Sequence, residues 1–143
     1  KMRYLGIDLG SKTVGLAMSD PTMTIASTFK TIFFKDENYK STIDEIKNIV
    51  EEYDIKKIIL GLPKNMNNTL GERAIITTEY KKLLEDNINI EVILFDERLT
   101  SVISNQILIE ADLSRKKRKK KVDSVAAQII LQDYLNKEKN EHE

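Results

Sequence analysis

Three acidic residues, Asp8, Glu97 and Asp123, stand at places where a folded chain could bring their carboxylates together. Asp8 ends a short apolar segment, Glu97 follows a second one, and Asp123 heads an apolar helical pattern. Carboxylates that share one site repel each other unless a cation neutralises them, and Mg²⁺ or Mn²⁺ prefers such hard oxygen ligands. Two such ions can activate water and stabilise the leaving oxygen of a phosphodiester. The three acids together therefore predict a metal site with the chemistry of a nuclease.

Each acid also has a purely structural explanation, which the sequence leaves open. Asp8 could simply end a strand, and Asp123 could be the N-cap of a helix, where the macrodipole favours a carboxylate. For Glu97, the competing explanation is a surface salt bridge with its neighbour Arg98 or an N-cap formed by Asp96 for a helix that follows it. A single acid is a weak indication, so the metal-site hypothesis depends on all three meeting.

A run of seven consecutive cations ends two residues before Asp123. The rest of the chain holds 16 Lys and Arg against 23 Asp and Glu, and so carries a net charge of −7. A phosphate backbone would be attracted to this run alone, although a solvated loop is the alternative. The run consists of Arg115, Lys116, Lys117, Arg118, Lys119, Lys120 and Lys121.

Three further cations could contact phosphate groups. Arg98 could orient the carboxylate of Glu97 or neutralise a phosphate oxygen, since arginine suits bidentate contacts with oxyanions; a structural ion pair is the alternative. Lys64 and Arg73 flank a polar loop that we expect at the same carboxyl edge as the acids, and they are second-rank candidates, because exposed salt bridges or simple solubility explain such residues better.

The hydrophobic pattern predicts an α/β fold. Residues 3–8 and 14–20 form a β-hairpin, which 28–34 extends into an antiparallel meander. Residues 58–62 are a continuous apolar run, typical of a strand buried on both faces of a sheet, and 91–95 are expected to form a second buried strand. The sequence thus predicts a five-stranded mixed sheet in which the last two strands run parallel to the first. The helices expected to flank it are 41–53, with Ser41 or Thr42 as N-cap, then 72–85, 101–111 and 123–135.

This topology would gather the acids. Parallel strands place their carboxyl ends at one edge of the sheet, and Asp8, Asp96 and Glu97 all stand at or just beyond such ends. Ligands of open α/β sheets usually bind off that edge.

Composition narrows the possibilities further. The chain has 143 residues, of which 41% are hydrophobic and 32% charged, as expected for one folded domain over 1–143 with a frayed polar tail over 137–143. Without cysteine, a metal must be held by oxygen ligands or by His142, the single histidine. No segment resembles a membrane span or a signal peptide, so we expect a cytoplasmic protein without membrane contact.

Six short motifs occur in order along nearly the whole chain. They occupy residues 6–12 (GIDLGSK), 17–20 (AMSD), 61–63 (GLP), 96–100 (DERLT), 114–117 (SRKK) and 123–127 (DSVAA). Together these motifs resemble the YqgF/RuvX family. The resemblance implies an RNase H-like fold shared with the RuvC resolvases, and a role as a Holliday-junction resolvase or as a nuclease that matures the 5′ end of the 16S rRNA precursor. It also places the acidic residues of the family on Asp8, Glu97 and Asp123.

Two positions depart from the family pattern. Thr13 stands where an arginine is usual, which leaves Lys12 to contact phosphate alone near Asp8. Asn68 replaces a glycine in the loop 65–69; asparagine tolerates the left-handed backbone conformation less freely than glycine. Neither change removes an expected metal ligand, so they bear on how the substrate is positioned.

Five aromatic residues could be base-stacking platforms, but their spacing favours core packing. They are Phe29, Phe33, Phe34, Tyr39 and Tyr53.

We therefore expect a nuclease that depends on Mg²⁺ or Mn²⁺ and acts on precursor rRNA or branched DNA. It would be a monomer or a homodimer, and it would associate with the ribosome. One alternative is a ribosome-assembly factor that binds RNA without cleaving it. A second is a phosphate-binding ATPase related to actin and sugar kinases, which would need a second lobe that a chain of this length does not supply.

Overall fold

The computed structural model describes residues 2–35, 38–62, 71–96 and 119–141; for 119–123 it describes the backbone only. Five strands form one sheet in the order β3-β2-β1-β4-β5. The strands are β1 (Arg3–Leu9), β2 (Thr13–Ser19), β3 (Ala26–Phe33), β4 (Ile55–Leu62) and β5 (Glu91–Asp96). The helices are α1 (Lys40–Glu52), α2 (Glu72–Asn87) and α4 (Lys119–Glu141).

The strand directions confirm the predicted mixed sheet. β1 pairs antiparallel with β2, and β2 pairs antiparallel with β3. β4 runs parallel to β1 on its other side, and β5 runs parallel to β4. A tight turn joins β1 to β2, closed by the backbone N–H of Gly10, which donates to the carbonyl of Thr13 at 2.7 Å.

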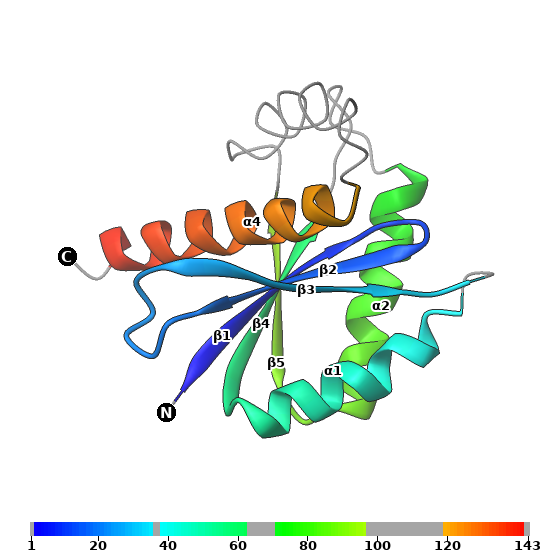
Figure 1. Ribbon diagram of the computed structural model, residues 1–143, viewed down its shortest axis with the longest axis horizontal. Helices are drawn as coiled ribbons and strands as arrows, with labels where there is room; N and C mark the ends of the chain where they lie inside the picture. Colours follow the sequence, from blue (N-terminus) through cyan, green and yellow to red (C-terminus); the bar gives the residue numbers. More distant parts are fainter. Residues whose placement is uncertain (1, 36–37, 63–70, 97–118, 142–143) are drawn as a thin grey trace.

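Helices cover both faces of the sheet (Figure 1). α1 and α2 pack on one face, and α4 lies across β1, β2 and β3 on the other. Each face has its own buried cluster: Leu5 and Ile7 of β1 belong to the α1 and α2 side, whereas Tyr4 belongs to the α4 side with Ala127 and Leu131. The alternation of side chains along β1 therefore divides the core into two layers.

Gly6 allows α4 to lie close to β1. A Cβ atom at this position would be 2.8 Å from the Cβ of Leu131 and 2.9 Å from the carbonyl oxygen of Ala127. Both distances are too short for a carbon atom, so only glycine fits here without a shift of the helix or the strand.

Helix α4 differs from its prediction at both ends. It begins at Lys119 and not at 123, so Asp123 lies within the helix and the alternative explanation of Asp123 as its N-cap is wrong. It continues to Glu141, past Asn136, after which the sequence predicts a frayed tail. The expected helix over 101–111 lies outside the described residues.

The start of α1 also differs from its prediction. The N-cap of α1 is Tyr39, without a side-chain cap, so the expected N-cap role of Ser41 or Thr42 is wrong. Their hydroxyls instead donate to the carbonyls of Asn38 and Tyr39 at 2.8 and 2.6 Å.

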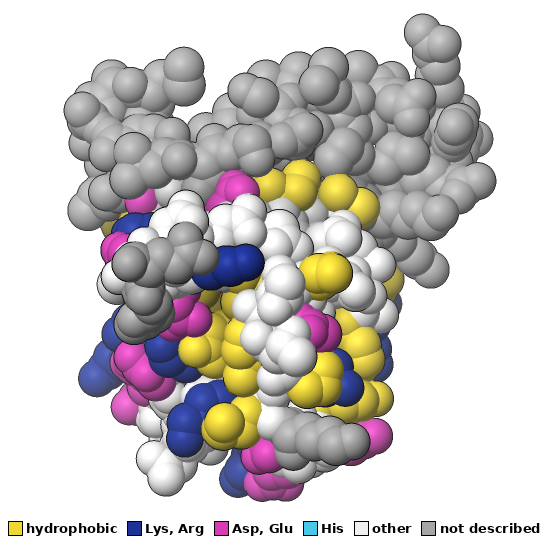
Figure 2. Space-filling view, turned by 90° about the vertical axis from the view of Figure 1, so that its left-hand side faces the viewer, with side chains coloured by type: hydrophobic (Ala, Val, Ile, Leu, Met, Phe, Trp, Pro, Cys, Tyr) yellow, Lys and Arg dark blue, Asp and Glu magenta, His cyan; other side chains and the backbone are white. Residues whose placement is uncertain are grey.

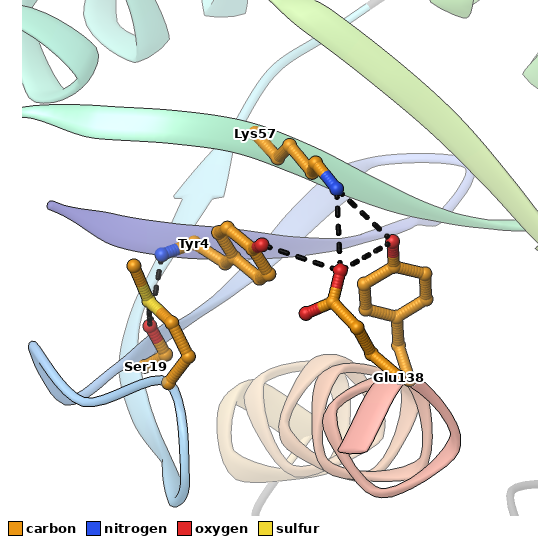
Figure 3. A network of polar contacts seen from close by, with 6 residues as sticks. Tyr4, Ser19, Lys57 and Glu138 are labelled. Carbon is orange, nitrogen blue, oxygen red and sulfur yellow. Dashed lines mark hydrogen bonds and ion pairs between the residues drawn. The ribbon is translucent and has the colours of Figure 1, made fainter. Parts of the chain in front are cut away.

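A polar network explains why α4 continues so far (Figure 3). The Oε2 atom of Glu138 lies 3.3 Å from the Nζ atom of Lys57 on β4. The same oxygen accepts hydrogen bonds from the hydroxyls of Tyr4 and Tyr134, each at 3.3 Å. These contacts order a helical turn that is polar in sequence.

The network also changes the acidity of its members. Burial, together with the charge of Glu138, raises the pKa of the Tyr4 and Tyr134 hydroxyls. Burial disfavours the charged form of Lys57, but its hydrogen bond to Glu138 and the nearby tyrosines outweigh this and raise the pKa of its ammonium group. Lys57 therefore stays protonated, and its ion pair with Glu138 persists across the neutral range.

In the part of the chain that the structure describes, no helix is both long and apolar enough to span a membrane.

Candidate active site

Asp8 lies near the carboxyl end of β1, half-buried, and pairs with Gly15 of β2. Tyr4 and Gly6, four and two residues earlier, both face α4. Because side chains alternate along a strand, Asp8 also belongs to the α4 side of the sheet. The first predicted ligand therefore stands between the sheet and α4, at the edge where ligands of this class of sheet bind.

The register of α4 on β1 brings residue 123 to the same level. Tyr4 contacts α4 at Glu138, whereas Gly6, further along the strand, meets it at Ala127 and Leu131, so the helix runs antiparallel to the strand. Moving from Gly6 to Asp8 advances about 7 Å along the strand, and moving back one turn from Ala127 to residue 123 advances about 6 Å along the helix. The backbone thus brings two of the three predicted positions toward each other.

The third predicted acid follows β5. This strand ends at Asp96, which pairs with Leu62 of β4. Phe95, one residue earlier, belongs to the buried cluster on the α4 side. Glu97 is the next residue in the sequence, and it lies outside the described residues together with Arg98.

Arg73 holds the end of β1. It projects from the first turn of α2, and its Nη2 atom donates to the carbonyl oxygen of Leu9 at 2.8 Å. The guanidinium is therefore one residue along the chain from Asp8. The sequence placed Arg73 at this edge but gave no sign of its contact with the main chain, because nothing local relates residues 73 and 9.

The other predicted phosphate-binding residues fall into three groups. Lys12 is exposed in the turn between β1 and β2. The backbone of Lys119, Lys120 and Lys121 forms the first turn of α4, so the alternative of a loop is wrong for these three residues. Residues outside the described ranges are Lys64, Arg115, Lys116, Lys117 and Arg118.

A hollow of about 560 Å³ lies between β3 and the first described side chains of α4. At its border the hydroxyls of Thr31 and the buried Ser124 are 2.7 Å apart. Sequence reasoning missed this hollow. The one signal was that Ser124 directly follows Asp123; the role of Thr31 depends on strand register, which the sequence does not specify.

The aromatic residues pack mostly as expected. Phe34 is buried, and its ring lies 4.9 Å from that of Tyr39. The rings of Phe29 and Tyr53 are 5.3 Å apart in an edge-on contact. Phe33 differs, because 55% of its surface is exposed, and it borders the hollow.

Charge is mixed at the opposite end of the molecule. Figure 2 views the side on which α4 ends, and there basic, acidic and hydrophobic side chains alternate without one sign dominating. The described side chains of this face carry no excess of positive charge that would attract a polyanion. Among the described side chains, no three His, Cys, Asp or Glu residues form a metal-binding group; two of the three predicted ligands are not among those side chains.

The sheet order and the helices on both of its faces define an RNase H-like protein. Thermus thermophilus RuvC, solved in complex with a Holliday junction substrate, shares the fold with a TM-score of 0.59 at 12% identity, over 97% of this chain and 96% of that one. The fowlpox virus Holliday junction resolvase shares it with a TM-score of 0.51 at 17% identity, over 95% and 99% of the two chains.

Sequence similarity is more specific than this fold class. The RuvX family, described as Holliday junction resolvase, matches residues 2–137, and the chain belongs to that family. A Listeria monocytogenes protein named "Putative pre-16S rRNA nuclease" is 48% identical over 135 residues, which cover 94% of this chain and 98% of that protein. A Clostridium beijerinckii protein of the same name is 50% identical over 135 residues, covering 94% and 96%.

Proposed function

We propose that this protein is a nuclease that requires a divalent metal ion and cleaves phosphodiester bonds of structured nucleic acid, with the 16S rRNA precursor as its substrate. The observation that carries the proposal is the placement of Asp8 at the carboxyl end of β1, at the level of residue 123 of α4. The names of the Listeria and Clostridium relatives support the choice of substrate.

Asp8, Glu97 and Asp123 would hold the metal. The donor chemistry fits Mg²⁺ or Mn²⁺, because the chain offers carboxylate oxygens at the edge of the sheet and contains no cysteine. A divalent cation bound there would stabilise the negative charge that develops on the phosphate during cleavage. Arg73 would keep the end of β1, and with it Asp8, in place through its bond to Leu9.

The cations near the acids would bind the phosphate backbone. Lys119, Lys120 and Lys121 belong to the first turn of α4, where the positive end of the helix macrodipole adds to their charge. We assign the same role to Lys12 and Arg98 and to Arg115, Lys116, Lys117 and Arg118, and a lesser one to Lys64 and Arg73. Phosphate contacts of this kind give affinity without base identity.

The Holliday junction is the second candidate substrate, favoured by the description of the family and by the fold shared with RuvC. Symmetric cleavage of a junction requires two active sites and therefore a dimer, whereas end maturation of rRNA can be done by a monomer. In the first case we expect a homodimer on DNA, and in the second a cytoplasmic enzyme that associates with ribosomal precursors.

A cleavage panel tests the proposal. Precursor rRNA, a four-way junction and single-stranded RNA are incubated with the protein in Mg²⁺ and in Mn²⁺, alongside an Asp8→Asn variant. The matched control is Asp86→Asn, since Asp86 is an exposed acid near the end of α2. We expect cleavage by the wild type and the control, and loss of at least 100-fold in Asp8→Asn.

Three outcomes would contradict the proposal. Full cleavage by Asp8→Asn would remove Asp8 from the site. Strong, salt-sensitive RNA binding without cleavage in either metal would favour a non-catalytic assembly factor. Tight and saturable ATP binding would favour the phosphate-binding ATPase.

A further inference from the structure

The described residues that line the hollow between β3 and α4 differ from those of a phosphate site. It lies between the outer strand β3 and α4 and has a volume of about 560 Å³, within the range of pockets that take small organic groups. Its described lining contains no charged side chain. It consists of Thr28, Phe29, Thr31, Phe33, Ser124, Val125 and Gln128.

The register of the sheet links this hollow to Asp8. Asp8 pairs with Gly15 on β2, and Gly15 pairs with Thr31 on β3. Two strand spacings separate Asp8 from Thr31, which is about 10 Å. Glycine adds no side chain between them. A nucleic-acid strand covers this distance in about three stacked nucleotides at 3.4 Å each, and in fewer when it is unstacked.

The lining offers an aromatic ring and neutral polar groups. Phe33 lines the hollow, and 55% of its surface is exposed. The amide of Gln128 is held in place by a hydrogen bond from its Nε2 atom to the carbonyl of Ala26 at 3.1 Å. Flat heterocycles bind such sites by stacking on the ring and by hydrogen bonding at their edges.

We propose that the hollow is a base pocket, which receives one unstacked nucleobase of the substrate strand close to the cleaved phosphodiester. This rests on the proposed nuclease function, and it adds that the enzyme selects unpaired nucleotides near the cut. A base inside a duplex would have to leave its stack to enter, which costs a few kcal/mol and favours single-stranded or bulged sites.

The test compares two changes, one in the protein and one in the substrate. Binding of single-stranded RNA 12-mers is measured in Ca²⁺ by fluorescence anisotropy, with an abasic nucleotide moved along the oligonucleotide. For the wild type, we expect at least one abasic position to weaken binding about 5- to 150-fold, the range for loss of one stacked base. For Phe33→Ala, the intact RNA should bind with that same loss, and the abasic position should add little.

Two further variants separate stacking from folding. Phe33→Tyr keeps an aromatic ring and should retain the wild-type dependence on the base. Ile25→Ala removes another exposed apolar side chain, 59% exposed and outside the pocket lining, and should also behave as wild type. If Phe33→Ala does not fold, Phe33→Leu takes its place, because it keeps an apolar side chain without the π face.

The outcomes distinguish this proposal from the nuclease itself. If the wild type cleaves RNA but no abasic position changes its affinity, the base pocket is refuted and the nuclease stands. If an abasic position matters in the wild type and not in Phe33→Ala, the pocket stands even when no metal supports cleavage. Equal dependence on the base in wild type and Phe33→Ala would place the base elsewhere and refute the pocket.

Discussion

Replacing Gly6 with alanine should force α4 and β1 apart and destabilise the fold. The new Cβ atom would lie 2.8 Å from the Cβ of Leu131 and 2.9 Å from the carbonyl oxygen of Ala127. Neither atom can move by rotating a side chain, so the helix or the strand has to shift. Overpacking of this kind costs about 1–3 kcal/mol. With an unfolding entropy of about 2.1 cal/mol/K per residue, that loss lowers the Tm of a 143-residue chain by roughly 3–10 °C.

Thermal unfolding followed by circular dichroism measures this effect. Ser27→Ala is a matched control, since Ser27 is exposed on β3 and a surface change of this size stays within about 0.5 kcal/mol. Leu131→Ala should not rescue Gly6→Ala, because the Leu131 atom in the way is its Cβ, which alanine retains. A Tm within 1 °C of the wild type for Gly6→Ala would refute the close approach of α4 to β1.

Two further predictions concern charge. Hydrogen bonds from the backbone N–H of Ile25, and from Thr22 and Thr24, hold the pKa of Asp20 well below its usual range. These bonds therefore stabilise the folded state fully above the ordinary aspartate pKa, and this contribution is lost progressively as the pH falls below about 4. Urea unfolding should thus show Asp20→Asn less stable than wild type at pH 7, with a gap that closes toward pH 2; a constant gap would contradict this. Changing Lys119, Lys120 and Lys121 together to glutamine should reduce the slope of log K against log salt for RNA binding by up to about 2, at about 0.7 per lost phosphate contact. Mg²⁺ binding should not weaken. An unchanged slope would show that these residues do not contact phosphate.

The sheet was predictable because its strands carry their own pattern. Residues 58–62 are apolar without interruption, which indicates a strand covered on both faces, and the structure buries Ile58, Ile59 and Leu60 completely. The position of Asp8 near the end of β1 followed from the same pattern. The direction of β4 and β5 followed from the connections before them, since crossovers of this length join parallel strands.

The register between distant strands was not predictable. The row from Asp8 through Gly15 to Thr31 depends on a shift in the pairing of β2 with β3 between Leu16 and Ala17. No local pattern marks that shift, and a change of one residue would turn Thr31 to the other face of the sheet. The base pocket could therefore not be found in the sequence.

The length of α4 escaped prediction for a different reason. Its first turn is a run of lysines and its last turns are polar, so neither end shows the apolar period that marks a helix. Lysine is nevertheless a good helix former, and the C-terminal turns are ordered by Glu138 through Tyr4 and Lys57. Those partners stand more than 80 positions earlier in the chain.

Helix α4 makes the proposed active site depend on packing at the other end of the molecule. Glu138 ties the helix to β1 and β4, and Gly6 sets its distance from the sheet in the middle. Residue 123 stands 15 positions before Glu138, about 22 Å away along the helix axis. A tilt of only about 3° around Glu138 would displace residue 123 by about 1 Å, and a misplacement of that size can lower a reaction rate about 100-fold. If the proposed carboxylate site is correct, the close fit at Gly6 and the contacts of Glu138 are requirements of that site as much as of the core.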